Sequence, residues 1–333
     1  MGCNIGFYGT HQTRPGPGST RTAKRWPACE NSAVMTAKLT DAIVDWYAQA
    51  ARELPWRTRD ATPWAVLVSE IMLAQTPVAR VLPAYEAWLD RWPTPALLAR
   101  ASRGDAVRMW GKLGYPRRAL RLHDCAGEIV ARFGGAVPDD VDALLSLPGV
   151  GAYTARAVAT FAFGQRHPVV DTNVRRVLAR AIDGQGAAAQ PSATRDHEAA
   201  LALLPQSPAE AAVLSIALME LGALVCTARA PRCQLCPIKA SCAWRAAGSP
   251  AYRGPATRPQ RFAGTDRQVR GLLLDVLRGS DHPVTRAALD AVWHEPAQRA
   301  RALDGLVGDG LVDPLPDGRY ALPGLDAKPG PVT

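Results

Sequence analysis

The sequence predicts a mainly α-helical protein of several domains, and three observations carry that prediction. Apolar residues recur at helical spacing through much of the chain, as at Ile43, Trp46 and Tyr47, which is the period of an amphipathic helix. A glycine-containing turn at 147–151 separates two such patterns. Four of the seven cysteines lie within 226–242, a density that favours metal ligation over a disulfide framework.

The overall composition narrows the classes of protein to consider. The chain has 333 residues, enough for two or three domains with separate cores. No apolar run approaches the ~20 residues that a membrane span needs. A formal net charge of +9 permits a polyanionic partner without proving one. Because no signal-peptide core is found near the start, we expect a cytoplasmic protein that does not bind a membrane.

The elements are expected in short succession. Residues 1–36 are rich in Gly, Pro, Arg and Thr and are predicted as a disordered tail. Residues 248–265 form a Pro/Arg/Gly-rich linker. Helices are predicted over the ranges 39–53, 64–76, 81–92, 95–100, 104–113, 152–163, 174–178 and 211–224.

The segment 266–323 forms a small separate unit, followed by a tail at 324–333. Apolar spacing predicts three helices, the second of them capped by Thr285. The turn Pro316–Gly318 lies between two short apolar stretches and predicts a terminal hairpin. Three helices and a hairpin are typical of a winged-helix-like domain.

The glycine turn is the first candidate for chemistry. Gly149, Val150 and Gly151 precede a helix whose free N–H groups and positive dipole end suit a DNA phosphate. Farther along, Asp171 can cap a new helix. Taken alone, both features are equally consistent with an ordinary helical hairpin and an ordinary cap.

Glu70 is the second candidate, because it shares a helix face with Leu67, Ile71 and Ala74. Burial there would disfavour the charged carboxylate and raise its pKa, which suits a general acid near neutral pH. The alternative is a glutamate at the edge of that face with its carboxylate in water.

The four clustered cysteines give the strongest single signal. Cys226, Cys233, Cys236 and Cys242 are separated by six, two and five residues. Thiolates at such spacing take zinc or an iron–sulfur cluster. A zinc ribbon pairs two Cys-x-x-Cys knuckles, whereas this set has one, so zinc is the less favoured alternative.

Together these motifs resemble the helix-hairpin-helix superfamily that includes endonuclease III, and within it the MutY-type adenine DNA glycosylases. The sequence 69–76, Ser-Glu-Ile-Met-Leu-Ala-Gln-Thr, is similar to the family motif Ser-Glu-x-Met-Leu-Gln-Gln-Thr. The stretch 110–118 is similar to Gly-Leu-Gly-Tyr-Tyr-x-Arg, with Pro116 in place of the second tyrosine. The short C-terminal region is similar to that of actinobacterial forms.

The resemblance covers about 39–247 and implies the helix-hairpin-helix DNA glycosylase fold. A six-helix domain with the hairpin would span 63–180, and an iron–sulfur cluster domain would combine 37–62 with 181–247. The cysteine spacing matches the family's [4Fe–4S] loop. The winged-helix-like unit would be an addition to this fold.

The resemblance also implies catalytic roles. Glu70 would protonate the leaving adenine, and Asp171 would stabilise or attack the cation that develops at C1′. Tyr153 and Asn173 would orient these two carboxylates. Bifunctional relatives carry a lysine where this chain has Tyr153, so a monofunctional hydrolase without strand-nicking activity is expected.

Further residues would contact DNA by the same resemblance. Trp56 and Arg57 would line the pocket of the extruded base. The expected DNA-binding residues are Gln75, Thr76, Leu113, Tyr115, Gly149, Val150 and Gly151.

The expected substrate is duplex DNA with adenine opposite 8-oxoguanine or guanine, bound by a monomer in the cytoplasm, at the nucleoid. The chain departs from the family at Ala74 and Ile216, and its tail is too short for the Nudix-like domain that reads 8-oxoguanine in relatives. Three alternatives stay open: a thymine or uracil glycosylase for G·T or G·U mispairs, a non-catalytic iron–sulfur DNA-binding regulator, and a structural zinc protein.

Overall fold

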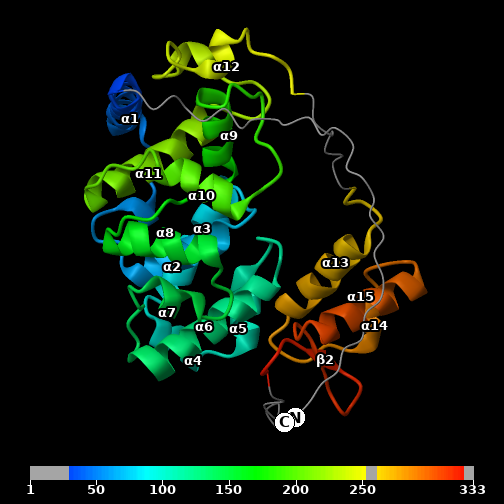
Figure 1. Cartoon of the computed structure of the whole chain (residues 1–333). Helices are drawn as coiled ribbons and strands as arrows, with labels where there is room; N and C mark the ends of the chain where they lie inside the picture. Colours follow the sequence, from blue (N-terminus) through cyan, green and yellow to red (C-terminus); the bar gives the residue numbers. More distant parts are fainter. Residues whose placement is uncertain (1–29, 253–260, 326–333) are drawn as a thin grey trace, which may run out of the picture.

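A computed structural model of the chain describes residues 30–252 and 261–325, with side chains from 37 onward (Figure 1). Residues 1–29 and 326–333 of the predicted tails, and residues 253–260 of the predicted linker, lie outside the described residues. The first helix begins at Glu30, inside the segment expected as a tail.

The main body is a stack of helices. Figure 1 shows α1, α9, α11 and α12 at one end, α2, α3 and α8 in the middle, and α4–α7 at the other end. The elements are α1 (Glu30–Ala50), η1 (Pro55–Arg57), α2 (Pro63–Leu73), α3 (Val78–Arg91), α4 (Pro95–Arg100), α5 (Arg103–Trp110), α6 (Arg117–Phe133), α7 (Val141–Leu145), α8 (Ala152–Phe163), α9 (Thr172–Ala181), α10 (Ala193–Leu201), α11 (Pro208–Leu224), η2 (Cys233–Leu235) and α12 (Ala243–Ala246).

Helix α2 is the centre of the six-helix region. Pro63 at its first position and the Thr62 hydroxyl, which accepts from the Ala65 N–H, start the helix. Every residue from Trp64 to Met72 is buried, so α2 has no solvent-facing side until its C-terminal end. It packs against α3 and α8, and this burial places whatever chemistry it carries inside the protein.

The described residues form two hydrophobic cores. One core runs through α2–α8, where Trp88 meets Trp92 and Trp110 edge-on at centroid distances of 4.7 and 5.7 Å. The second joins Ile43 of α1 to α9, α10 and α11. The first core includes α2, which carries Glu70, and the second includes α9, which begins after Asp171. Glu70 and Asp171 therefore lie on opposite sides of the boundary between the two cores.

The C-terminal unit contains three helices and a hairpin, as the sequence predicts. Its elements are α13 (Asp266–Arg278), α14 (Arg286–Asp290), α15 (Pro296–Gly308), β1 (Asp313–Pro314) and β2 (Tyr320–Ala321). The strands pair antiparallel, and Val284 bridges to Tyr320. Thr285 caps α14, accepting from the Ala288 N–H, which confirms the predicted cap. The assignment as a winged helix stays a prediction.

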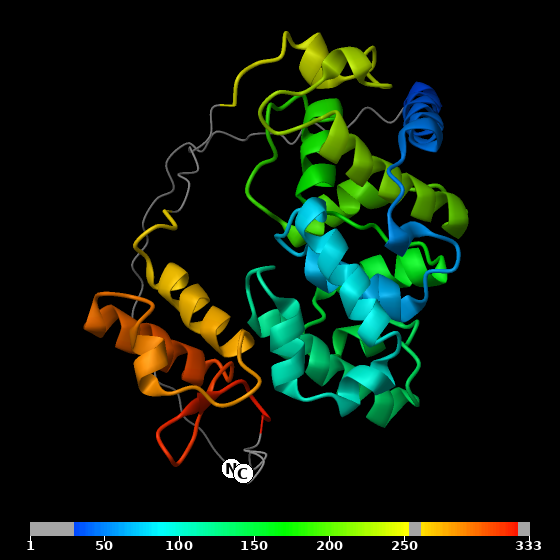
Figure 2. The ribbon, with the colours of Figure 1, turned by 180° about the vertical axis from the view of Figure 1, so that it is seen from behind.

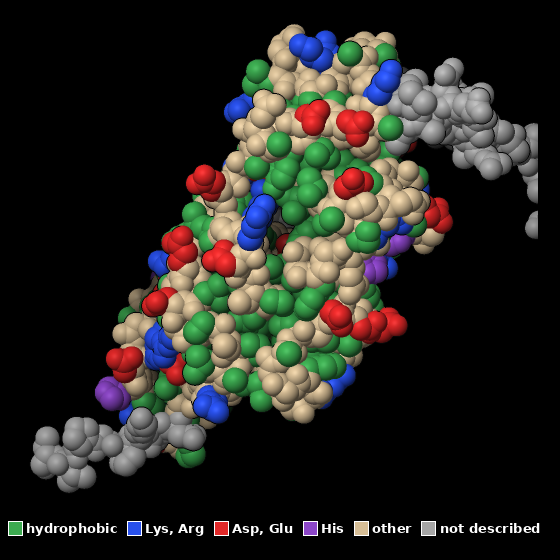
Figure 3. All heavy atoms as spheres, turned by 90° about the vertical axis from the view of Figure 1, so that its left-hand side faces the viewer, with side chains coloured by type: hydrophobic (Ala, Val, Ile, Leu, Met, Phe, Trp, Pro, Cys, Tyr) green, Lys and Arg blue, Asp and Glu red, His purple; other side chains and the backbone are tan. Residues whose placement is uncertain are grey.

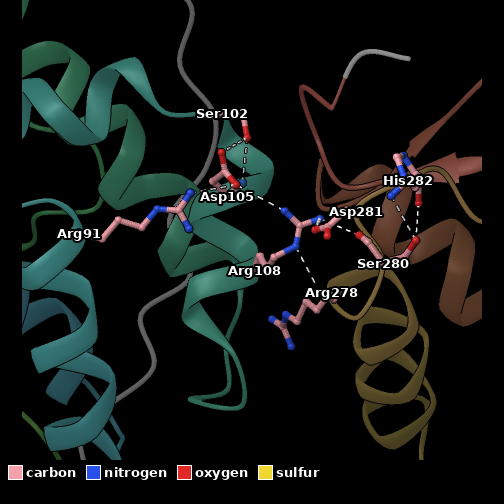
Figure 4. A network of polar contacts seen from close by, with 8 residues as sticks. All are labelled: Arg91, Ser102, Asp105, Arg108, Arg278, Ser280, Asp281 and His282. Atoms are coloured by element: carbon pink, nitrogen blue, oxygen red, sulfur yellow. Dashed lines mark hydrogen bonds and ion pairs between the residues drawn. The ribbon is translucent and has the colours of Figure 1, made fainter. Parts of the chain in front are cut away.

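This unit is docked on α5 by a polar network (Figure 4). The Arg108 guanidinium donates to the carbonyls of Arg278 at 3.3 Å and Ser280 at 2.7 Å. Arg278 in turn donates through Nε to the Val107 carbonyl at 3.0 Å. Apolar residues of α13 and α15, such as Leu273 and Leu306, belong to the first core. The unit is therefore packed on the body and not only tethered to it.

The predicted helices are present, with shifted ends, and α6, α7, α10 and the short α12 lie outside the predicted ranges. Helix α2 ends at Leu73, before the predicted end at Thr76, because Gln75 has a φ of 60° that no α-helix accommodates. In the part of the chain that the structure describes, no helix is long and apolar enough to cross a membrane.

Candidate functional site

The buried carboxyl group of Glu70 is the first component of the site. Burial in α2 raises the pKa of Glu70 from 4.5 to about 7, because removal from water disfavours the carboxylate. A side-chain hydrogen bond with Tyr153 and the charge of Arg57 lower this pKa, and the charge of Asp171 raises it. Glu70 is therefore partly protonated near neutral pH, as a general acid requires.

Tyr153 lies in the first turn of α8 and reaches the same site. Burial raises the pKa of the Tyr153 phenol well above 10, and the neighbouring charges of Glu70 and Asp171 add to this shift. The phenol therefore keeps its proton and donates it to the carboxylate of Glu70 in a hydrogen bond. Tyr153 fixes the orientation of that carboxyl group.

Asp171 is the second carboxylate and begins α9. Its Oδ1 accepts from the N–H groups of Asn173 at 2.8 Å and Val174 at 2.7 Å, which confirms the predicted cap. Its Oδ2 accepts from Asn173 Nδ2 at 2.7 Å. Asn173 is held in turn by Arg176, whose Nη2 donates to Asn173 Oδ1 at 2.7 Å. Backbone and side chain together hold Asp171 in one orientation.

The two predicted base-pocket residues differ in their surroundings. Arg57, at the end of η1, is close enough to Glu70 and Tyr153 for its charge to lower the pKa of both. Trp56 is instead buried and meets Tyr85 edge-on, with ring centroids 5.0 Å apart. Arg57 thus belongs to the carboxylate site, whereas Trp56 packs in the core behind it.

Glu220 of α11 is a member of this region that the sequence reading missed. It is fully buried and accepts from Arg52 Nε at 2.6 Å and Nη2 at 2.8 Å, and from Arg57 Nη1 at 3.0 Å. Glu220 therefore positions Arg57 beside Glu70. Its sequence signal is the same one that draws attention to Glu70: a lone carboxylate in an apolar helix.

Gln75 and Tyr115 form an exposed corner beside the site. Both have left-handed backbone angles, with φ of 60° and 47°, which cost energy for residues other than glycine. Arg118 holds this geometry: its Nη1 donates to the carbonyls of Ile71, Met72 and Ala74, and its Nη2 donates to Gly114 and Thr76.

The other residues predicted at this corner are less exposed. Thr76 and Leu113 are buried, and the Thr76 hydroxyl donates to the Leu113 carbonyl at 3.4 Å. They join the two loops beneath the corner, so the surface itself is made by Gln75 and Tyr115.

The glycine turn lies beside α6, the helix that follows this corner. Gly149 has a φ of 80°, and a Cβ there would lie 2.8 Å from Arg121 Cβ, so the position requires glycine for two reasons. Val150 is buried, whereas Gly149 and Gly151 are exposed. No side chain caps α8 after Gly151, which leaves its first N–H groups available to an anion.

The four clustered cysteines lie close together in the fold. Cys226, Cys233, Cys236 and Cys242 all line one small cavity between α9, α11 and the loop before α12. Arg180 lies beside it, with Nη1 3.4 Å from Cys226 Sγ. Among the described residues, no three His, Cys, Asp or Glu side chains are grouped to hold a single metal ion.

Comparisons with known proteins agree with this geometry. Residues 68–197 match the model of the HhH-GPD superfamily base excision DNA repair proteins. The adenine DNA glycosylase of Mycobacterium tuberculosis H37Rv is 58% identical over 283 residues, which cover 85% of this chain and 92% of that protein. The chain belongs to the adenine DNA glycosylase family. The predicted resemblance is thereby confirmed.

Other similar proteins place this adenine DNA glycosylase family member within its superfamily. A thymine/uracil-DNA glycosylase of Pyrobaculum aerophilum is 38% identical over 204 residues, covering 60% of this chain and 88% of that protein. The solved structure of a thermostable thymine-DNA glycosylase superposes with a TM-score of 0.59 at 24% identity, covering 66% of this chain and all of the other. The predicted mainly α glycosylase fold is confirmed.

Proposed function

We propose that this chain hydrolyses the N-glycosidic bond of adenine opposite 8-oxoguanine or guanine in duplex DNA, without cutting the strand. One observation carries the proposal: two carboxyl groups share a site, but only one of them accepts hydrogen bonds from N–H donors on both of its oxygens. Glu70 is buried with a raised pKa, whereas Asp171 accepts three N–H bonds. Such a pair supplies an acid and an anion at one glycosidic bond.

The chemistry follows from this pair. Glu70 donates its proton to the base, so that the base leaves as a neutral molecule. The ionised Asp171 stabilises the positive charge that develops at C1′ while the bond breaks. Tyr153 and Asn173 hold the two carboxyl groups in place. Water then adds to C1′, and the proton it releases restores the site.

The absence of strand cutting rests on Tyr153. A phenol forms no imine with the sugar, and its raised pKa keeps it protonated and bound to Glu70. Its role is therefore to orient the acid.

We also propose that the cysteine cavity holds a [4Fe–4S] cluster on Cys226, Cys233, Cys236 and Cys242. The donor set fits, because four thiols line one cavity and the cation of Arg180 lies beside Cys226. In a cluster each iron binds one thiolate, so the four thiolates lie farther apart than they would around a single zinc ion. The cluster when bound would fix the loop 226–242 against α9, and no catalytic step passes through it.

The DNA contacts proposed for the body follow the geometry of the exposed groups. The hairpin Gly149–Gly151 would hold phosphates of the strand that carries the target base, as the positive end of α8 favours. Gln75 and Tyr115 would enter the base stack when the nucleotide is extruded. Duplex DNA is then the partner of a monomer that works in the cytoplasm, at the nucleoid.

The test is single-turnover excision on matched duplexes with A opposite 8-oxoguanine, A opposite G, and T or U opposite G, with and without alkali. Adenine release that breaks the strand only after alkali supports the proposal. Release of T or U instead would support a mispair glycosylase, which the 38% identity to the Pyrobaculum protein makes the second candidate. No release from any duplex would favour a DNA-binding regulator.

The variant Asp171→Asn gives the sharpest test of the mechanism. Asparagine also caps a helix, so α9 is retained while the negative charge is lost. We expect excision to fall by about 10²–10³-fold, with duplex binding retained. Asp140→Asn, which alters the corresponding cap of α7, is the matched control and should excise normally. Full activity of Asp171→Asn would refute the mechanism.

A further inference from the structure

A large cleft separates the C-terminal unit from the corner that carries Tyr115. It has a volume of about 1040 Å³ and is lined by Gln75 and Tyr115 on one side and by α13 on the other. Figure 2 shows α13 beside the α5–α6 region, away from the end of the body that holds α1 and α12. The volume exceeds the ~300–1,000 Å³ typical of small-molecule pockets.

The cleft is strongly basic. Eight Lys and Arg side chains line it, against the two carboxylates of Asp275 and Asp309. Those carboxylates already pair with Lys112, Arg117 and other lining cations. Within the described residues, four of the eight cations form no ion pair. Arg80 and Arg118 instead donate to backbone carbonyls. The other two are Arg121 and Arg267. By contrast, Figure 3 shows a face on which both signs of charge are interspersed around a hydrophobic middle.

Two exposed aromatic rings lie in the same cleft, one on each wall. Tyr115 and Phe262 are each 52% exposed. A guanidinium lies over each ring at 5.4 Å from its centroid: Arg118 over Tyr115 and Arg267 over Phe262. Exposed rings among arginines are the combination that single nucleic-acid strands use, with phosphates on the cations and bases stacked on the rings.

The position of Arg121 indicates which strand this would be. Arg121 packs against Gly149 of the hairpin and also lines the cleft. The hairpin and the cleft are therefore adjacent surfaces, and Gln75 and Tyr115 line the cleft. A duplex with one strand on the hairpin and its stack opened by that corner meets the cleft with its other strand.

We propose that this cleft binds the DNA strand opposite the target base, with phosphates on Arg267 and Arg121 and a base face on Phe262. The inference rests on the proposed glycosylase function for the choice of strand. It assigns DNA contact to α13, the first helix of the unit. In a helix-turn-helix reader, by contrast, the recognition helix is a later one. The network of Arg108 and Arg278 keeps α13 at a fixed distance from the corner.

The experiment measures duplex affinity of the full-length chain as a function of salt. The duplex carries 2′-fluoro-deoxyadenosine opposite 8-oxoguanine, because fluorine disfavours charge at C1′ and prevents cleavage. Arg267→Glu should weaken binding by about 10-fold at low salt and reduce the slope of log K against log salt by about one. Arg319→Glu reverses a charge at the hairpin of the same unit, outside the cleft, and should change neither quantity.

Neutral methylphosphonate linkages identify the strand. Placed in the opposite strand, they should weaken the wild type, yet add no further loss to Arg267→Glu. Phe262→Ala should also weaken binding, by about fivefold or more, whereas Tyr252→Ala alters an exposed ring outside the cleft and should not.

Two results would overturn the proposal: Arg267→Glu binding duplex as tightly as Arg319→Glu does, or a coupling to linkages in the target strand. A wild type that binds with these couplings but excises no base would contradict the proposed function and leave the cleft assignment standing. A wild type that excises adenine while Arg267→Glu binds normally would support the proposed function and contradict the cleft assignment.

Discussion

Glu70 and Glu220 are both buried in apolar helices, yet their surroundings shift their pKa values in opposite directions. Glu70 has one hydroxyl donor and a more distant arginine, and burial raises its pKa to about 7. Glu220 faces Arg52 and Arg57 directly, and their hydrogen bonds and charges outweigh burial and lower its pKa. Burial alone therefore does not raise the pKa of a carboxyl group. The pKa rises when a buried carboxyl group also lacks a hydrogen-bonded cation.

Arg57 connects the two regions. It donates to Glu220 at 3.0 Å, and its charge still reaches Glu70. One glutamate is thus a permanent anion that holds a cation in place, and the other feels that cation only weakly. The difference separates a structural carboxylate from a proposed catalytic one.

Removing Glu70 should have the largest effect on activity. Glu70→Gln removes the acidic proton while keeping the shape, so single-turnover excision should fall by about 10²–10⁴-fold. Wild-type excision should decline as pH rises through about 7, because the acid is then lost, and the variant should lack this decline. The measurement is a pH profile of the excision rate for both proteins. A wild-type rate that rises through pH 7 would contradict the assignment of Glu70 as the acid.

Removing Glu220 should affect stability most. Glu220→Gln leaves two guanidinium groups without their anion, at a cost of about 3 kcal/mol in free energy of unfolding. We take the low end of the range because the side chain of Arg52 is 34% exposed.

The pH dependence of stability should also distinguish the two glutamates. Glu220 has a lowered pKa, so its stabilisation is present above the unfolded-state pKa and is lost as pH falls through the folded value. Glu70 has a raised pKa, so its contribution is present at low pH and is lost as pH rises toward 7. Urea unfolding of Glu220→Gln and Glu70→Gln across this range measures both. Parallel pH dependence of the two variants would contradict the comparison.

The smallest predicted effect concerns Arg57. Arg57→Gln removes a charge that lowers the pKa of Glu70, so the decline in excision should move to higher pH by a small amount. Arg52→Gln is the matched control, because Arg52 pairs with Glu220 and is not among the groups that shift Glu70. The two pH midpoints of excision provide the comparison. Equal shifts in both variants would show that Glu220, and not the charge of Arg57, governs the acid.

The sequence predicts some residues of this site and not others, for physical reasons. A cap such as Asp171 and a turn such as Gly149 are local, so the sequence predicts them directly. Glu70 is identifiable because its neighbours along one helix are apolar. The partners of Glu220 lie more than 160 positions away along the chain, and no local pattern reports them. The same is true of Arg118. The resemblance includes it in a motif, but only the fold shows that it binds the two loops in which Gln75 and Tyr115 have positive φ angles.

Gly104 carries a consequence for the history of the molecule. Its N–H donates to the Pro323 carbonyl at 2.6 Å, and a Cβ there would lie 2.8 Å from the same oxygen. The start of α5 thus has room for the C-terminal segment only while it lacks a side chain. A recombination event that exchanged only one of these two segments would place a side chain against the Pro323 carbonyl or lose the contact. We therefore expect the start of α5 and the C-terminal segment to be inherited together and to covary among descendants.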